Sequence, residues 1–260
     1  MTSNLENSKR KIVKVLFVRG FLTDVRTVDS IDIYKSIRNY FIGMKEKASI
    51  QWFSYGPNDD LHEVYGKLVD RIKHEKPDIL IGHSLGGLLV YHYLVETVFI
   101  TKSVSIDRPM PRPVLLMPYL QPTPSRIYRL VRYVPSFIRK RLYIPSVFIS
   151  RQPLLDIALS DYRIAQFDQI YQAEEFMTLN KKRLLQNLTS FKIKILYATN
   201  ETVSTIDEDI VDKLMQSGHL SMVQGTHDAH NTRREYGDFF EVLDETLEVL
   251  FSDLLSDTDT

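Results

Sequence analysis

The stretch PDILIGHSLGGLLVYHY, residues 77–93, decides the expected fold. A short apolar run at 79–81 leads into GHSLG at residues 82–86, and an apolar segment of helix-compatible composition follows. This pattern predicts a buried strand, a tight turn and a helix. GHSLG fits the pattern GxSxG, in which small residues flank a serine so that a strained turn can hold its hydroxyl clear of the sheet.

A strand before this motif and a helix after it are the surroundings that a nucleophile elbow requires. On these features the chain resembles the α/β-hydrolase superfamily, of the serine esterase and lipase type, over most of its length. The resemblance implies an α/β fold with a doubly wound, mostly parallel sheet, and a catalytic triad in the chain order serine, acid, histidine. It makes Ser84 the expected nucleophile and calls for no metal or cofactor.

Composition sets wider bounds on the protein. A chain of 260 residues, 43% of them hydrophobic, can bury one substantial core, so we expect a single domain over residues 1–260. The formal net charge is zero, which gives no argument for nucleic acid as a partner. The chain has no cysteine, which excludes disulfides, thiolate metal sites and a cysteine nucleophile.

The N-terminus opens polar, and its first apolar run is interrupted by Lys14 and stops at Arg19. That run is too short and too charged for a signal peptide or a membrane span. We therefore expect a soluble, cytoplasmic protein.

Most of the chain alternates strand and helix patterns. Strands are expected at 11–18, 49–55, 79–81, 114–117, 191–197 and within 219–223, and helices at 28–45, 60–74, after the elbow, and from 235 onward. This alternation is typical of a doubly wound sheet with helices on both faces.

The loop after the first strand reads Arg19-Gly20-Phe21. In similar proteins it often reads His-Gly-Phe or His-Gly-Trp, and the N–H after the glycine forms half of the oxyanion hole. The resemblance therefore assigns the two oxyanion donors to the backbone N–H groups of Phe21 and Leu85. Arg19 departs from the frequent histidine, and the alternative is a plain glycine turn at the end of a strand.

The acid of the triad is expected after the strand at 191–197. In similar proteins that loop often reads Gly-x-x-Asp-x-Val, and aligning the strands puts Glu201 on the acid position. Ala198 and Glu201 both depart from this pattern, so Asp207 is the alternative acid. Glu201 would otherwise be an exposed loop carboxylate.

The histidine is expected in the loop after the last strand. That loop reads QGTHDAH from residue 224, and the family keeps its histidine in such a Gly-x-His loop before the C-terminal helix, which makes His227 the expected general base. His230 is the second candidate. His83, inside the elbow, is expected to pack rather than to catalyse.

Residues 119–190 leave the strand-helix rhythm and contain helix-like pieces broken by prolines. The family commonly inserts a helical cap or lid at this point, and we interpret the segment as one. Between Asp107 and Asp156 the chain has no acid and nine basic residues, namely Arg108, Arg112, Arg126, Arg129, Arg132, Arg139, Lys140, Arg141 and Arg151.

Two interpretations of this basic stretch stay open. It could contact an anionic membrane peripherally, or steer an anionic acyl substrate toward the serine. Its basic side chains could instead be solvated or pair with the acidic C-terminal region, which carries nine acids and no Lys or Arg from Glu235 onward.

The leading hypothesis is a serine hydrolase that acts on a small-molecule carboxylic ester, with lipid esters and thioesters among the candidate substrates. A peptidase or amidase on the same scaffold is one alternative, because the motif does not distinguish them. The other alternative is a non-catalytic protein of the same fold that binds a ligand, partner or membrane.

Overall fold

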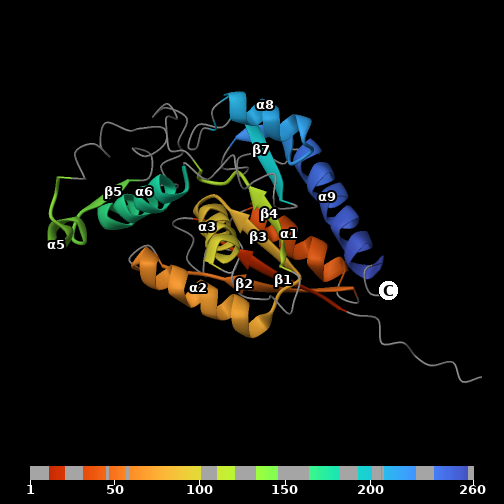
Figure 1. Ribbon diagram of the computed structural model, residues 1–260, viewed down its shortest axis with the longest axis horizontal. Helices are drawn as coiled ribbons and strands as arrows, with labels where there is room; N and C mark the ends of the chain where they lie inside the picture. The colour runs from red at the N-terminus through yellow and green to blue at the C-terminus, as the bar shows by residue number, and fades with distance from the viewer. Residues whose placement is uncertain are drawn as a thin grey trace, which may run out of the picture.

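The centre of the computed structural model is a six-stranded parallel sheet in the order β2-β1-β3-β4-β7-β8 (Figure 1). The model describes residues 12–20, 32–44, 47–56, 59–100, 110–120, 133–145, 164–181, 193–200, 206, 208–226 and 237–256. The strands are β1 (Val13–Val18), β2 (Ala48–Phe53), β3 (Ile79–His83), β4 (Arg112–Leu116), β7 (Lys194–Asn200) and β8 (Leu220–Thr226). The predicted fold class, an α/β fold with a doubly wound and mostly parallel sheet, is confirmed.

Helices cover both faces of this sheet (Figure 1). Side chains of α1 (Asp32–Gly43) and α9 (Gly237–Ser256) share one buried cluster with the first face, and those of α2 (Leu61–Glu75), α3 (Leu85–Ile100) and α8 (Glu208–Gln216) share a second cluster with the other face. The strands supply both clusters by alternation, because successive side chains point to opposite faces. In β3, Ile79 and Ile81 join the first cluster and Leu80 joins the second.

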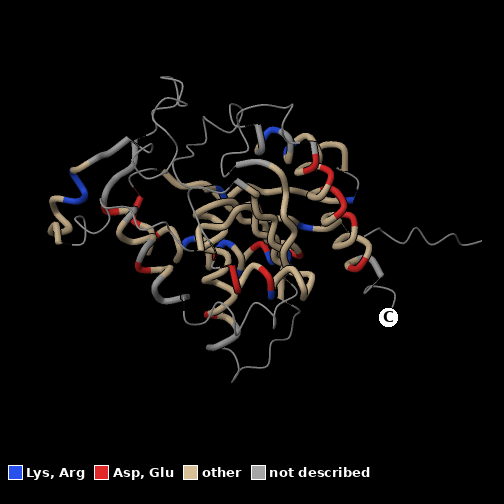
Figure 2. Tube along the Cα trace, turned by 90° about the horizontal axis from the view of Figure 1, so that it is seen from above, with Lys and Arg blue, Asp and Glu red and all other residues tan. Residues whose placement is uncertain are grey.

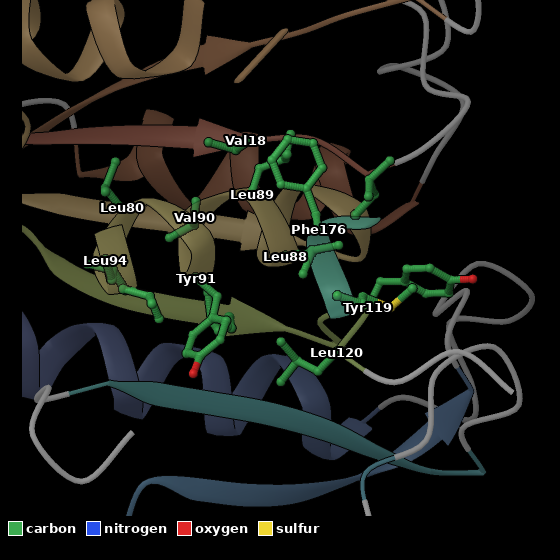
Figure 3. Close-up of a cluster of buried hydrophobic side chains, with 14 of the residues drawn as sticks. Val18, Leu80, Leu88, Leu89, Val90, Tyr91, Leu94, Tyr119, Leu120 and Phe176 are labelled. Atoms are coloured by element: carbon green, nitrogen blue, oxygen red, sulfur yellow. The ribbon is translucent and has the colours of Figure 1, made fainter. Parts of the chain in front are cut away.

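Helix α3 has no polar face. Other parts of the protein pack around nearly all of it, and a helix in such a position needs apolar side chains all round. Its side chains at 88–91, 94 and 95 are each 0% exposed. Figure 3 shows Leu88, Leu89 and Leu94 of α3 in one cluster with Val18 of β1, and with Phe176. Phe176 belongs to a helix within the segment predicted to be a cap.

Within residues 119–190 the structure describes α5 (Ser136–Arg139), β5 (Tyr143–Pro145), β6 (Ile164–Gln166) and α6 (Phe167–Lys181). Strands β5 and β6 form an antiparallel pair, whereas the sequence had predicted only helical pieces there. Three-residue strands are too short to show a periodicity of two, so the sequence gives no signal for them. Helix α6 packs against α2 and α3.

A polar contact holds α6 to the beginning of α2. The side chain of Gln172 is 7% exposed, and its Oε1 accepts a hydrogen bond from the N–H of Leu61 at 2.7 Å while its Nε2 donates to Oδ2 of Asp60 at 2.8 Å. Asp60 also caps α2 by accepting from the N–H groups of the next turn. Gln172 thus gives a partner to one of the first N–H groups of α2, which have none within the helix.

A second glutamine one turn earlier makes a similar contact. Nε2 of Gln169, a residue 1% exposed, donates to the carbonyl oxygens of Gly56 at 2.8 Å and Asp59 at 2.6 Å. We refer to Gln169 and Gln172 together as the amide anchor. Because both amides are buried and bonded to the loop and cap before α2, the anchor fixes the position of α6 on the sheet layer.

One of the nine basic residues, Arg112, forms an ion pair with the acidic C-terminal helix. Nη1 of Arg112 lies 2.7 Å from Oδ2 of Asp253 on α9. Arg139 and Lys140 lie instead near acids outside the C-terminal region, Asp168 at 2.8 Å and Asp60 at 3.9 Å. The predicted pairing with the acidic C-terminal region is therefore seen for Arg112. It is not the pairing that Arg139 and Lys140 make.

No helix in the described ranges combines the length and the apolarity that crossing a bilayer requires.

Asp60 generates a prediction about stability. Burial acts to raise the pKa of this carboxyl group, but hydrogen bonds from Gln172 and from the N–H groups of Glu63 and His62 outweigh it and lower the pKa. Such a group stabilises the fold above its unfolded pKa, and the contribution is lost as the pH falls through the folded pKa. Asp60→Ala should therefore lower the free energy of unfolding at neutral pH by about 1 kcal/mol, with a smaller loss in acid. Urea unfolding of both proteins over a pH series measures this difference.

Asp60→Asn is the matched control. Asn caps helices about as well as Asp but does not titrate, so this variant should keep most of the stability and lose the pH dependence. A loss in Asp60→Ala that is equal in acid and at neutral pH would contradict the role given to the carboxylate.

Candidate active site

Ser84 occupies the turn between β3 and α3 in a strained conformation. Its φ is 52°, in the left-handed region that non-glycine residues rarely adopt. The surrounding chain holds it there, because its N–H donates to the carbonyl of Leu116 at 3.0 Å and its carbonyl accepts from the N–H of Tyr119 at 3.0 Å. Strain of this kind persists only where the surrounding structure enforces it, and it collects at functional sites.

The turn lies directly against the end of β1, and Gly86 makes that approach feasible. A Cβ at position 86 would collide with the carbonyl oxygens of Val18 and Arg19. A Cβ on Gly20 would likewise come within 2.9 Å of the Ser84 Cβ. The absence of both side chains lets the beginning of α3 and the end of β1 meet backbone to backbone.

The hydroxyl of Tyr34 on α1 links the end of β1 to His83, the residue before Ser84. The N–H of Gly20 donates to the Tyr34 oxygen at 3.0 Å, and that oxygen lies 2.8 Å from Nδ1 of His83. The rings of Tyr34 and His83 also meet edge to face, with centroids 5.4 Å apart. His83 is 4% exposed, so its contacts fit the predicted packing role.

Arg19 is buried, with 3% of its surface exposed, and its guanidinium lies 5.5 Å from the centroid of the Trp52 ring. Its carbonyl accepts a hydrogen bond from the hydroxyl of Tyr55 at 3.1 Å. Burial, followed by the neighbouring Tyr34, raises the pKa of Tyr55, which keeps that hydroxyl protonated and able to donate. At the position where similar proteins often carry histidine, this chain thus has an arginine that supports the end of β1 by packing.

Leu85 is the first residue of α3, a helix of sixteen residues. The first N–H groups of a helix have no partner within the helix, and its dipole makes this end partly positive. Ser84 therefore stands beside a helix end that favours a developing negative charge. Leu85, which the sequence predicts to be an oxyanion donor, is the first residue of this helix end, and its role as a donor stays a prediction.

The other predicted site residues lie outside the described residues. They are Phe21, Glu201, Asp207, His227 and the second candidate histidine His230. The residue before each of four of them is described, namely Gly20 after β1, Asn200 at the end of β7, Ile206 before Asp207, and Thr226 at the end of β8. The structure therefore brings Ser84, Leu85 and Gly20 together and leaves the acid and the base as predictions.

The residues that support the turn from behind were not predicted as part of the site. Tyr34 falls on the apolar face of a predicted helix, and Tyr55 falls at the end of a predicted strand, so both look like ordinary core residues in the sequence. Only the tertiary structure brings their hydroxyls to the end of β1. Within the described residues, no group of His, Asp and Glu side chains is arranged to hold a metal ion.

Comparisons with known proteins give a family and a fold. The sequence profile of the family described as "Alpha/beta hydrolase family" matches residues 38–232, which is more than half of the chain. No curated protein sequence matches the chain.

Solved structures with a similar fold include three proteins at low identity. They are MenH from S. aureus (15% identity, 94% of this chain and 94% of that chain, TM-score 0.47), the thermostable carboxylesterase EstE1 cloned from a metagenomic library (14%, 94% and 80%, 0.45) and the RedJ thioesterase of the prodiginine biosynthetic pathway in Streptomyces coelicolor (11%, 94% and 89%, 0.43).

Gly86 and Gly66 provide a matched pair of substitutions. Gly86→Ala must push α3 away from β1, and we expect the free energy of unfolding to fall by at least about 3 kcal/mol. Gly66 lies in the interior of α2, and a Cβ there would meet nothing within 4 Å. Gly66→Ala should therefore raise the free energy of unfolding by about 1 kcal/mol. Chemical denaturation of both variants tests this, and a small effect of Gly86→Ala would contradict the backbone contact.

Proposed function

The chain belongs to the alpha/beta hydrolase family, and from this membership we propose that it is a serine hydrolase that cleaves a carboxylic ester through an acyl-serine intermediate. Lipid esters and thioesters are the two substrate subclasses we favour. The observation that carries the proposal is the strained Ser84 at the junction of β3 and α3. A conformation this costly, at the end of a central strand and the start of a buried helix, is the arrangement that presents a nucleophile.

The base and the acid are proposed from the order of the sheet. All described strands of the main sheet run parallel, so their carboxyl ends share the edge at which Ser84 lies. His227 directly follows β8 and Glu201 directly follows β7. We assign His227 as the general base and Glu201 as the acid that orients it.

Asp207 is the alternative acid in this proposal. It directly precedes α8, which begins at Glu208. Aspartate before the first residue of a helix has a common structural use as an N-cap. Glu201 therefore remains the first assignment, and substituting each acid separately would distinguish them.

The proposed reaction has two half-steps. In the first, Oγ of Ser84 bonds to the substrate carbonyl carbon while His227 takes the hydroxyl proton, and the carbonyl electron pair moves onto oxygen. The bond to the leaving alcohol or thiol then breaks as His227 returns that proton to it. In the second, water repeats the sequence on the acyl-serine and releases the acid.

The developing oxyanion needs donors that are already in place. Leu85 supplies the N–H at the start of α3, and we assign the second donor to the N–H of Phe21. Such donors contribute about 3 kcal/mol each in comparable sites. Gly20 precedes Phe21 and is held by Tyr34, so the Tyr34 hydroxyl positions the strand end from which the second donor extends.

We further propose that residues 119–190 form the cap of a single domain that spans residues 1–260. The amide anchor and the packing of Phe176 on the α3 cluster tie α6 to the sheet layer. In this proposal the cap sets the substrate class, and the sheet supplies the chemistry.

Labelling by a fluorophosphonate, which reacts with activated serines, tests the central claim. The wild type should label, and Ser84→Ala should lose labelling by at least about a thousandfold, since the nucleophile is removed. Ser49→Ala, an exposed serine on β2, should label like the wild type. Failure of well-folded wild-type protein to label would favour a non-catalytic binding protein instead.

A second experiment compares the turnover of an ester, a thioester and an amide that carry the same acyl group. This comparison identifies which type of bond the protein cleaves. We expect the ester or thioester to turn over faster than the amide, because alcohols and thiols leave more readily than amines. Preferential cleavage of the amide would instead indicate a peptidase or amidase.

Tyr34→Phe tests the positioning role of the tyrosine hydroxyl. Without this acceptor the Gly20 N–H loses its partner, and we expect the labelling rate to fall by about tenfold through the displaced strand end. Tyr65→Phe removes a partly buried hydroxyl that donates to Glu96 of α3 at 2.5 Å, and serves as the control. Equal labelling rates in the two variants at matched stability would contradict the role of Tyr34.

A further inference from the structure

Large apolar side chains gather on the surface in one short segment. Eight such side chains are exposed within the described residues, and four of them lie between positions 133 and 142. They are Tyr133 at 76%, Phe137 at 69%, Ile138 at 38% and Leu142 at 40% exposure. The other four are scattered over separate elements, as single exposed apolar residues usually are. We call residues 133–142 the apolar knuckle, because a cluster of this kind marks an interaction site.

The apolar knuckle is held in place from its inner side. Nε of Arg139 lies 2.8 Å from Oδ1 of Asp168 on α6, and its Nη1 donates to the carbonyl of Val134 at 2.7 Å. The guanidinium also lies 3.9 Å from the centroid of the Tyr171 ring. Asp168 is 2% exposed and the side chain of Arg139 is 11% exposed, so little of this ion pair is open to solvent. The exposed side chains therefore project from a fixed support, which lowers the entropic cost of binding.

The charged residues within the apolar knuckle are all basic. Lys140 and Arg141 follow α5 directly, both are exposed, and the knuckle itself contains no acid. The acids that the structure puts beside it are Asp168, bonded to Arg139, and Asp60, 3.9 Å from Lys140. In Figure 1 the α5 turn forms the outermost part of its side of the described chain, and on the same side of Figure 2 it is drawn with blue and tan segments.

From this combination we propose that the apolar knuckle docks on an anionic lipid bilayer. Phe137, Ile138 and Leu142 enter the boundary between headgroups and acyl chains, while Lys140 and Arg141 meet the anionic headgroups. This inference goes beyond the proposed hydrolase and does not depend on it.

A bilayer fits these features better than a protein partner does. A stable protein interface needs about 800 Å² on each side, which is more than four side chains on one projecting turn provide. A second copy of the chain would bring Lys140 and Arg141 against the same positive charges across a two-fold axis. A bilayer needs neither a broad flat surface nor a complementary shape.

Vesicle flotation with the full chain tests the proposal. The wild type should float with phosphatidylcholine vesicles that contain phosphatidylserine and should stay in solution with pure phosphatidylcholine. Phe137→Ser combined with Ile138→Ser should weaken the binding by at least about tenfold. Arg141→Gln should weaken it by about fivefold, and raising the salt should weaken wild-type binding in the same direction.

Met215→Ser combined with Val249→Ser is the matched control, since these exposed apolar residues lie on α8 and α9. This variant should bind like the wild type. Unchanged binding of both the Phe137/Ile138 variant and Arg141→Gln would overturn the proposal, as would wild-type protein that stays in solution at low salt. Equal binding to pure phosphatidylcholine would overturn the preference for anionic lipid.

Two further measurements separate the alternatives. If gel filtration with light scattering shows a wild-type dimer that Phe137→Ser converts to a monomer, the knuckle is a self-association surface and the proposal fails. Ser84→Ala should float like the wild type while losing fluorophosphonate labelling. Labelling without flotation would thus reject the membrane proposal alone, and flotation without labelling would reject the hydrolase proposal alone.

Discussion

The start of α3 lies against the end of β1 with no side chain between them, and the candidate site depends on this contact. Because Gly86 has no Cβ, its main chain can approach the carbonyl groups of Val18 and Arg19. The contact brings three features to one point, namely a helix end with free N–H groups, the strained Ser84 and the strand end at Gly20. Any side chain at position 86 would separate the helix from the strand, and would separate Ser84 from Gly20.

The parallel sheet brings the ends of strands that are distant in the sequence to the edge at which Ser84 lies. Its strands are parallel and covered on both faces, so they read as nearly continuous apolar runs in the sequence. In open sheets of this kind, ligands bind beyond the carboxyl ends of the strands. The sheet is thus a rigid support, and residues far apart in the chain can reach Ser84 from neighbouring strand ends.

Features that are local in the chain could be predicted from the sequence, and features that join distant segments could not. The strands of the main sheet and the turn at Ser84 have periodic or motif signals within a few residues. Helix α8 was not predicted, although its buried Ile210 and Leu214 stand four residues apart, which is the spacing of one face of a helix. The amide anchor joins residues more than 100 positions apart, and its glutamines look like solvent-facing residues of an ordinary helix. Composition likewise identified a basic stretch but not its contacts, which proved to be different for Arg112 and Arg139.

The amide anchor also bears on the order in which the chain folds. The bond between Gln172 and Leu61 closes a loop of 111 residues, and a loop this long has a large entropic cost before its contact forms. We expect the strands and their covering helices to assemble first and α6 to dock afterward onto a finished surface. A segment that docks late, through the amide anchor and the buried side chains of Ala173, Phe176 and Met177, can be exchanged during divergence while the nucleus of the fold is kept. Under the proposed function, such an exchange would change the acyl preference of a relative while the turn at Ser84 stays the same.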